Sequence, residues 1–239
     1  MNKKQKIAIF DIDGTIFRKN LQFELINELS WMNIFPHKVR DQIVRLYTDW
    51  LEHKGEYESY RQGLVSLYEK YIKGCSVKDV QRASKVVVSF HKDRTYIFAE
   101  KLIDKLRAEG YHLIAISGSP IEIVKEFDLS HLRFDAVFGS VYEIDGKGIY
   151  TGKAYYEPVK NKGNLVRQYV WEHDLTLDGS YGMGDTESDA SFLDIVENPI
   201  AFNPNDNLKE IAQKHGWRLV VEKKDVVYDI TQCANMNLI

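Results

Sequence analysis

Short apolar runs bounded by polar or charged residues recur along the chain, and each predicts a buried β-strand. The runs are at residues 7–10, 112–116, 135–138, 180–183 and 199–202, with a sixth candidate at 217–221. Two segments between them, 97–109 and 165–173, place apolar residues at helical spacing. Strands that alternate with helices are typical of a parallel sheet covered on both faces. We therefore expect an α/β fold.

Residues 20–92 depart from this alternation and have a helical pattern throughout. Two apolar stripes stand out, Val39, Ile43, Leu46 and Trp50, and then Tyr57, Tyr60, Leu64, Leu67 and Tyr71. We expect these stripes to be the core of the inserted helices rather than a ligand surface. An insertion after the first strand would lie above the carboxyl ends of the strands, where open α/β sheets bind ligands. The predicted division is an α/β core of residues 1–17 and 93–239 and a helical cap of residues 18–92.

Two further segments lie outside these patterns. Asp145–Gly148 separates two short β-type runs, 141–144 and 149–151, and predicts a β-hairpin. The pattern of residues 223–239 is weak, so that a final helix and a loose tail both stay open.

Composition limits the function without naming it. The 239 residues are 44% hydrophobic and 28% charged, which argues for a globular protein and against disorder. The formal net charge of −3 gives no indication of nucleic-acid binding, because DNA-binding proteins usually carry a basic surplus. Two distant cysteines, Cys75 and Cys233, argue against a disulfide scaffold. No apolar stretch has the length of a signal-peptide core or a membrane span, so we expect a cytoplasmic protein.

Candidate chemistry begins with Asp11 and Asp13, which directly follow the first predicted strand. Gly14 permits a turn there, so both carboxylates can face one crevice. Two carboxylates this close repel unless a cation or a proton relieves the conflict. An ordinary acidic turn is the alternative for this string alone. An EF-hand loop does not fit, because the glycine comes too early and no Glu closes the loop.

Three more strand ends carry polar groups. Ser117 and Gly118 follow the strand at 112–116 and can form an anion cradle with a hydroxyl and backbone N–H groups. Lys162 lies just before the helix expected from about residue 165 and can neutralise a phosphate oxygen. Each of these motifs has an ordinary structural explanation when it is taken alone.

Asp185 and Asp189 follow the strand at 180–183 and lie about one helical turn apart. Carboxylate sites with open positions suit Mg²⁺, which prefers a few carboxylates, waters and the phosphate of a substrate. The parallel strands of one sheet would bring all four motifs to one edge. Their conjunction predicts a magnesium-dependent phosphate site.

These motifs, in this order, resemble those of the haloacid dehalogenase (HAD) superfamily of phosphatases, and the resemblance covers nearly the whole chain. The inserted helices resemble the α-helical cap of the phosphoserine-phosphatase-like branch, as do the residues from Tyr181 to Trp217. The resemblance implies a Rossmann-like parallel sheet core with an inserted α-helical cap. It also implies an enzyme that hydrolyses the phosphate monoester of a small metabolite.

The resemblance implies a role for each candidate residue. Asp11 would be the nucleophile that forms an aspartyl-phosphate, and Asp13 would be the general acid and base. Ser117, the Gly118 N–H and Lys162 would hold the phosphoryl oxygens. Mg²⁺ would bind the carboxylates of Asp11 and Asp185 and the backbone carbonyl of Asp13, with Asp189 as an outer or occasional ligand.

Two positions depart from the pattern of the phosphoserine enzymes. Those enzymes carry a Glu nine residues after the nucleophile to hold the amino group of the substrate, where this chain has Asn20. Ser119-Pro120 also stands where they usually show another Gly and an aromatic residue. Both departures argue against L-phosphoserine as the substrate. Arg18, Lys19 and Arg61 would be the groups to bind a second anionic group, although solvated surface charge is the better explanation for each.

Other functions stay open from the sequence alone. A phosphomutase or phosphotransferase would use the same site with a hydroxyl acceptor in place of water. A non-catalytic receiver-like switch also pairs Asp residues with Mg²⁺, a hydroxyl and a Lys, but it is shorter and lacks the inserted helices. A dehalogenase is disfavoured because it needs neither Asp13 nor the metal site. The sequence gives no indication of the oligomeric state.

Overall fold

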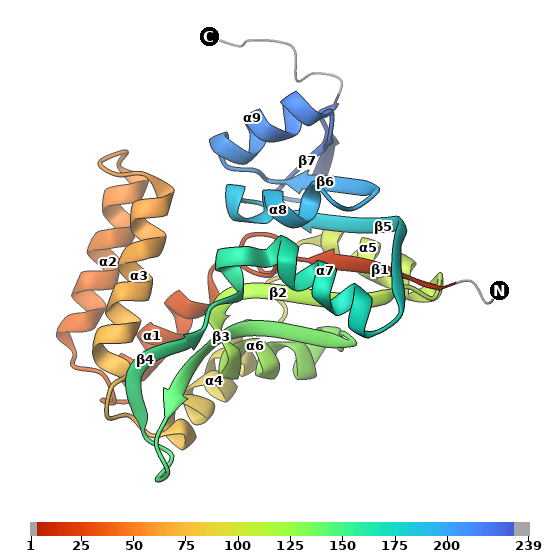
Figure 1. Cartoon of the computed structure of the whole chain (residues 1–239). Helices are drawn as coiled ribbons and strands as arrows, with labels where there is room; N and C mark the ends of the chain where they lie inside the picture. The colour runs from red at the N-terminus through yellow and green to blue at the C-terminus, as the bar shows by residue number, and fades with distance from the viewer. Residues whose placement is uncertain (1–3, 232–239) are drawn as a thin grey trace.

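The computed structural model describes residues 4–231, which build one sheet of eight strands with helices on both faces (Figure 1). The strands lie in the order β4-β3-β2-β1-β5-β6-β7-β8. Their bounds are β1 Gln5–Phe10, β2 His112–Pro120, β3 Ala136–Ile144, β4 Tyr150–Tyr156, β5 Leu175–Gly184, β6 Asn198–Phe202, β7 Arg218–Lys223 and β8 Val226–Asp229. The predicted α/β fold is confirmed.

The six central strands, β3, β2, β1, β5, β6 and β7, are parallel to one another. Only the two edge strands, β4 and β8, run antiparallel to their neighbours. β1 lies at the centre between β2 and β5, with Ile9 opposite Ile114 on one side and Gly182 on the other. The carboxyl ends of these three strands therefore meet at one edge of the sheet.

The alternation of side chains along β1 separates the two hydrophobic clusters of the protein. Ile7 and Ile9 face one cluster, and Ala8 and Phe10 face the other. The first cluster is covered by α7 Lys162–Glu172, α8 Ala190–Leu193 and α9 Asp206–His215. The second is covered by α5 Ile97–Ala108, α6 Ile121–Phe127 and helices of the insertion. Short single turns complete the helical segments, η1 Asp128–Leu132, η2 Pro158–Asn161 and η3 Glu187–Asp189.

The insertion after β1 is helical, as the sequence predicts. Its helices are α1 Leu21–Trp31, α2 Lys38–Leu51, α3 Tyr57–Ile72 and α4 Val77–His91. The side chains of Asn20 and Ser76 cap α1 and α4 by accepting hydrogen bonds from Phe23 N and Asp79 N. Apolar residues of α1 and α4 join the same buried cluster as β1 and α6. The pair α2 and α3 stands beside the carboxyl ends of the strands (Figure 1). The division of the chain at residues 17 and 93 stays a prediction.

The predicted hairpin is confirmed, and it joins β3 to β4 around Asp145. The runs at 135–138 and 141–144 belong to one continuous strand, β3. The expectation of a helix or loose tail over residues 223–239 is wrong for β8, whose four residues pair with β7. All four are exposed, so no burial pattern marked them as a strand. Residues 232–239 lie outside the described residues.

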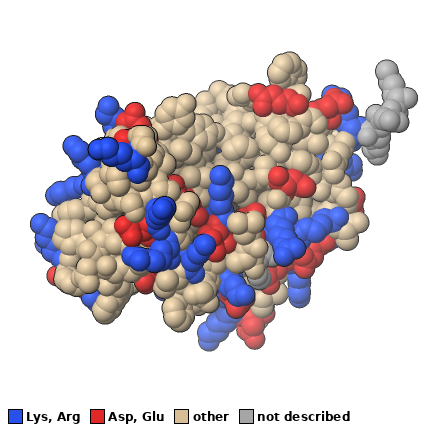
Figure 2. All heavy atoms as spheres, turned by 90° about the horizontal axis from the view of Figure 1, so that it is seen from below, with Lys and Arg blue, Asp and Glu red and all other residues tan. Residues whose placement is uncertain are grey.

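Within residues 4–231, no helix is both long enough and apolar enough to cross a bilayer. The face shown in Figure 2 carries Lys and Arg side chains interspersed with Asp and Glu side chains. That face therefore has no extended field of a single sign.

Candidate active site

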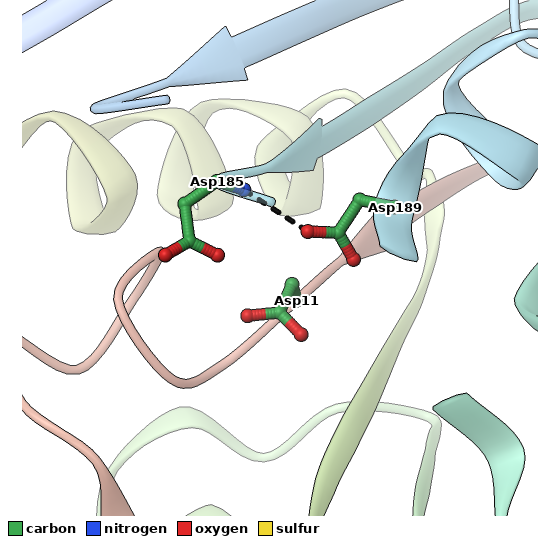
Figure 3. A group of neighbouring side chains, drawn as sticks. All are labelled: Asp11, Asp185 and Asp189. Atoms are coloured by element: carbon green, nitrogen blue, oxygen red, sulfur yellow. Dashed lines mark hydrogen bonds between the residues drawn. The ribbon is translucent and has the colours of Figure 1, made fainter. Parts of the chain in front are cut away.

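Three buried aspartates meet at the carboxyl edge of the sheet. Asp11 follows β1 and donates its backbone N–H to Met183 O of β5 at 2.9 Å. This pairing brings Asp11 beside Asp185, which follows β5, and Asp189 lies one turn later in η3. One carboxylate oxygen from each residue lies within 4.8 Å of the others. The three side chains converge on one point (Figure 3), as the sequence predicts for a metal site.

Lys162, at the first position of α7, is the cation of this cluster. Its buried ammonium donates to Asp11 Oδ1 and Asp189 Oδ1, each at 2.6 Å, and to Ile116 O at 3.2 Å. The helix thus begins at residue 162 rather than near residue 165. All three donors of Lys162 point at carboxylate or carbonyl oxygens of the protein. Its predicted contact with a phosphoryl oxygen stays a prediction.

The cluster carries more negative than positive charge. Burial is the largest effect on Asp11 and, with the charges of Asp189 and Asp13, raises its pKa to about 8 although Lys162 opposes the shift. Burial and the charge of Asp11 raise the pKa of Asp185 well above its usual range. Burial lowers the pKa of Lys162, but the carboxylates of Asp11 and Asp189 outweigh burial and raise it. A bound cation would relieve the repulsion among the carboxylates.

The donor set fits Mg²⁺. Asp11 Oδ2 is buried and has no hydrogen-bond partner among residues 4–231, which leaves it open to a cation or to a substrate. Asp189 differs, because both of its oxygens are occupied. Its Oδ2 accepts from the backbone N–H groups of Asp185 and Thr186, at 3.0 and 3.1 Å, while Oδ1 accepts from Lys162. The oxygens of Asp189 thus hold the loop and the lysine in place.

Asp13 lies outside this group of three and is held by a separate set of donors. Its Oδ1 accepts from Leu21 N at 2.5 Å. Its Oδ2 accepts from the hydroxyls of Ser117 at 2.6 Å and Ser119 at 2.8 Å. Burial raises the pKa of Asp13, and hydrogen bonds from Ser117, Leu21 and Ser119 act in the opposite direction. Asp13 is therefore fixed in place with a pKa above that of an ordinary aspartate.

Ser119 is a site residue that stands out in the sequence only as a departure from the phosphoserine-phosphatase pattern. Besides donating to Asp13, its hydroxyl accepts from Gln22 N at 3.1 Å, so it links β2 to the start of α1. The available signal was the pair of hydroxyl residues at 117 and 119, which project from the same face of an extended segment. Ser117 bonds to Asp13, and its predicted phosphate contact stays a prediction.

Gly14 allows the loop after β1 to approach Asp185. Its φ is +85°, in the left-handed region that glycine tolerates best. A Cβ at this position would lie 2.0 Å from Asp185 Oδ2. The glycine predicted from the turn is thus also required for the closeness of the two loops.

A small cavity of about 40 Å³ opens over the acid site. Its lining residues include Asp11, Asp13, Asn20, Tyr57, Arg61, Gly118, Ser119, Lys162, Asp185 and Thr186. Among the cations proposed from the sequence, Arg61 pairs with Glu58, Arg18 with Glu222 and Lys19 with Glu24. Tyr57 and Thr186 were not predicted as site residues.

The expectation that the aromatic stripes form a helical core is confirmed, and one end of the stripes also borders a cavity. Val39, Ile43 and Leu64 are buried in the main cluster as expected. Trp50, Tyr57 and Tyr60, however, line a second and larger cavity beside the acid site. A periodicity analysis finds the apolar face of a helix but not whether that face meets protein or a cavity.

Residues 8–194 match the family model of haloacid dehalogenase-like hydrolases. The chain belongs to the haloacid dehalogenase-like hydrolase family. This confirms the resemblance found in the sequence. The order of the motifs and the buried acid cluster of this HAD-like hydrolase agree with the assignment.

Similar sequences span nearly the whole chain. A phosphoserine phosphatase of Methanocaldococcus jannaschii is 25% identical over 229 residues, which cover 95% of this chain and 96% of that protein. A histidinol-phosphatase of Neisseria meningitidis is 21% identical over 228 residues, which cover 89% of this chain and 97% of that protein. The two relatives carry the names of different phosphatases, so sequence similarity leaves the substrate open.

Solved structures show the same fold. A protein of unknown function from Bordetella pertussis superimposes with a TM-score of 0.71 at 19% identity, covering 91% of this chain and 98% of that one. A substrate-bound phosphoserine phosphatase gives 0.65 at 22% identity, covering 94% and 96%. At these identities the structural likeness establishes the fold and leaves the chemistry to the site residues.

Proposed function

We propose that this HAD-like hydrolase is a Mg²⁺-dependent phosphomonoesterase that acts on a small phosphorylated metabolite through an aspartyl-phosphate on Asp11. The observation that carries the proposal is Asp11 Oδ2, a buried carboxylate oxygen without a partner among the described residues, beside the separately held acid Asp13. Relatives named phosphoserine phosphatase and histidinol-phosphatase support the phosphatase activity predicted from the sequence.

In the first step, Asp11 Oδ2 attacks the phosphorus atom, and the bond from phosphorus to the ester oxygen breaks. Asp13 supplies the proton that the leaving oxygen needs. A raised pKa suits this role, because it keeps a proton on Asp13 to a higher pH than in an ordinary aspartate. The products are the free alcohol and a mixed anhydride of Asp11 with phosphate.

In the second step, Asp13 acts in the reverse sense. It takes a proton from a water molecule, whose oxygen attacks the phosphorus of the aspartyl-phosphate. The bond from phosphorus to Asp11 breaks, inorganic phosphate leaves, and the carboxylate of Asp11 is restored. The hydroxyls of Ser117 and Ser119 hold Asp13 in one position for both proton transfers.

The phosphoryl oxygens need positive charge and N–H donors around them. Gly118 and Lys162 line the small cavity. Gly118 would supply a backbone N–H, and the ammonium group of Lys162, whose donors engage Asp11, Asp189 and Ile116 O, would supply positive charge. Mg²⁺, when bound by Asp11, Asp185 and the Asp13 carbonyl, would neutralise phosphoryl charge that builds up in the transition state. Fixed donors of this kind typically lower a barrier by about 2.7–4 kcal/mol each.

The arrangement around Asn20 supports a substrate other than phosphoserine. Asn20 is neutral, and its side-chain oxygen accepts from Phe23 N as the cap of α1. Glu24, one turn further along the chain, is buried, and its carboxylate pairs with Lys19 at 2.9 Å and lies 3.6 Å from His91 Nε2. Neither residue leaves a free negative charge for the amino group of an amino acid.

The test is release of inorganic phosphate from simple alkyl phosphates with Mg²⁺ and with EDTA. We expect activity with Mg²⁺, none with EDTA, and at least a 1,000-fold lower rate for Asp11→Asn, in the order of magnitude found when a nucleophile is removed. Asp178→Asn, an exposed aspartate outside the site, is the matched control. Equal rates for Asp11→Asn and the unaltered protein would contradict the proposal. Transfer of phosphate to an added alcohol without release into water would favour a phosphotransferase.

A further inference from the structure

A cavity of about 640 Å³ lies beside the acid site, between the α2–α3 pair and the loops that follow β1 and β6. It shares four lining residues with the small cavity over Asp11, namely Asn20, Tyr57, Asp185 and Thr186. The two cavities are therefore neighbours, and an ester whose phosphate lies at Asp11 has room there for its alcohol group. Cavities of about 300–1,000 Å³ are typical of small-molecule sites, so the space exceeds what a three-carbon alcohol fills.

Aromatic side chains form much of the wall of this cavity: Phe23, Tyr47, Trp50, Tyr57, Tyr60 and Tyr96. Trp50 stacks on Tyr60 with ring centroids 5.6 Å apart and an interplanar angle of 14°. Tyr57 meets Trp50 edge-on at 5.3 Å. These contacts fix the orientation of the rings before any ligand binds. Preformed aromatic surfaces bind planar rings by stacking and by edge-to-face contact.

The charges around the cavity are already paired. Arg18 bonds to Glu222 and to Thr95 O, and its guanidinium lies 4.8 Å from the centre of the Tyr96 ring. Lys19 bonds to Glu24 at 2.9 Å. The cations that line this wall thus have carboxylate partners, and a second anionic group on the substrate would have to compete with Glu222 and Glu24 for them.

The carboxylates are engaged as well. Of those lining the larger cavity, Asp206 bonds to Lys209 at 2.8 Å and Asp185 belongs to the acid cluster. An ammonium group on the substrate would have to compete with Lys209 for Asp206, whose side chain is 81% exposed to solvent. The wall therefore favours an uncharged group over the charged groups of an amino acid.

We propose that this cavity holds the leaving group, and that the substrate is the phosphate monoester of an alcohol bearing an uncharged planar ring. The proposal rests on the proposed function, since it places the phosphate at Asp11. Trp50, Tyr57 and Tyr60 are then specificity-determining residues that contact the ring and take no part in the chemistry.

The test compares five primary alkyl phosphates, so that the leaving oxygen is chemically similar in each. They are ethyl phosphate, 2-phenylethyl phosphate, 2-cyclohexylethyl phosphate, choline phosphate and O-phospho-L-serine. We expect kcat/KM for 2-phenylethyl phosphate to exceed that for ethyl phosphate by about tenfold or more, the scale of one buried ring contact. The cyclohexyl ester has the same length without a planar ring, and we expect its kcat/KM to be several-fold lower than that of the phenyl ester.

Variants identify the wall. Trp50→Leu should lower kcat/KM for 2-phenylethyl phosphate about tenfold more than kcat/KM for ethyl phosphate, mainly through KM. Tyr47→Leu removes a ring that is 40% exposed, so it tests the same wall with less risk to folding. Trp171→Ala, which removes an 83% exposed tryptophan on α7, is the matched control and should change neither substrate. Thermal melting verifies that each variant is folded.

Several results would overturn the proposal. One is a preference for phosphoserine or choline phosphate, the latter because aromatic walls also bind quaternary ammonium groups. Equal kcat/KM values for the phenyl and cyclohexyl esters would show that the cavity does not select a planar ring. Equal losses of kcat/KM on ethyl and 2-phenylethyl phosphate in both wall variants would show that the wall residues do not determine specificity for the ring. Hydrolysis of none of the five esters with Mg²⁺ would refute the proposed function itself, and this inference with it.

Discussion

Replacing Ser119 with alanine tests how the acid Asp13 is held. The Ser119 hydroxyl, 2% exposed, donates to Asp13 Oδ2 at 2.8 Å and accepts from Gln22 N at 3.1 Å. The alanine removes both contacts without adding volume. Asp13 keeps its bonds to Ser117 and to Leu21 N, so its carboxylate stays in place but is held less firmly.

The expected magnitude follows from the lost bond. A hydrogen bond to a charged group contributes about 1.5–3 kcal/mol, and about 1.4 kcal/mol corresponds to a tenfold change in rate. With two of three donors retained, we expect the lower end, a loss of about tenfold in kcat/KM. The hydrogen bond from Ser119 also lowers the pKa of Asp13, so its removal raises that pKa. The protonated acid then persists to higher pH, and the basic limb of the pH profile of kcat/KM shifts to higher pH.

The assay is phosphate release from ethyl phosphate between pH 5 and pH 9 at saturating Mg²⁺. Ser84→Ala is the matched control, because Ser84 is also fully buried and its hydroxyl bonds only to Val80 O within the described contacts of α4. We expect the control to lose stability without any movement of the pH profile. A Ser119→Ala enzyme with kcat/KM within twofold of the unaltered protein and the same profile would refute the reasoning.

Three further predictions concern the acid cluster. Lys162→Met leaves the buried carboxylates of Asp11 and Asp189 without their cation, so we expect the free energy of unfolding to fall by about 3–5 kcal/mol in urea without Mg²⁺; Lys209→Met, on the surface, should change it little. In the metal-free fold the pKa of Asp11 rises from 3.8 to about 8, so folding binds a proton and stability falls as pH rises through that range. Mg²⁺ should therefore raise Tm more at pH 8 than at pH 5.5, and an equal rise at both would contradict this. Gly14→Ala places a methyl group against Asp185, and we expect the Mg²⁺ concentration for half-maximal activity to rise about 10–100-fold; an unchanged value would exclude the close approach of the two loops.

The strands and the acid cluster could be predicted because their signals are local. The apolar run at 7–10 is buried on both faces, and a carboxylate directly after it must lie at the strand end. Parallel pairing of β1 with β5 then brings Asp11 and Asp185 together. Asp189 follows from its spacing of one turn. Apolar runs and fixed spacings are properties of the local sequence, which is why these predictions hold.

The remainder depends on contacts between distant segments. β8 is exposed on all four residues and exists only because β7 offers it an edge to pair with. Ser119 is tied to Asp13 and Gln22, 106 and 97 residues away, and the pairing of hydroxyls at 117 and 119 within β2 does not by itself indicate which distant residues they contact. Whether Trp50 and Tyr60 meet packed protein or a cavity depends on where the α2–α3 pair lies relative to the loops that follow β1 and β6. Such features require the three-dimensional fold.

The most direct test of the central claim is chemical trapping of the phosphorylated residue. The enzyme is quenched with acid during turnover of ethyl phosphate with Mg²⁺, and the aspartyl-phosphate is then reduced with borohydride and located by peptide mass spectrometry. We expect the reduced product, homoserine, at position 11, and none when EDTA is present or when substrate is omitted. Full turnover with no modification at Asp11, or modification at Asp185 instead, would contradict the account.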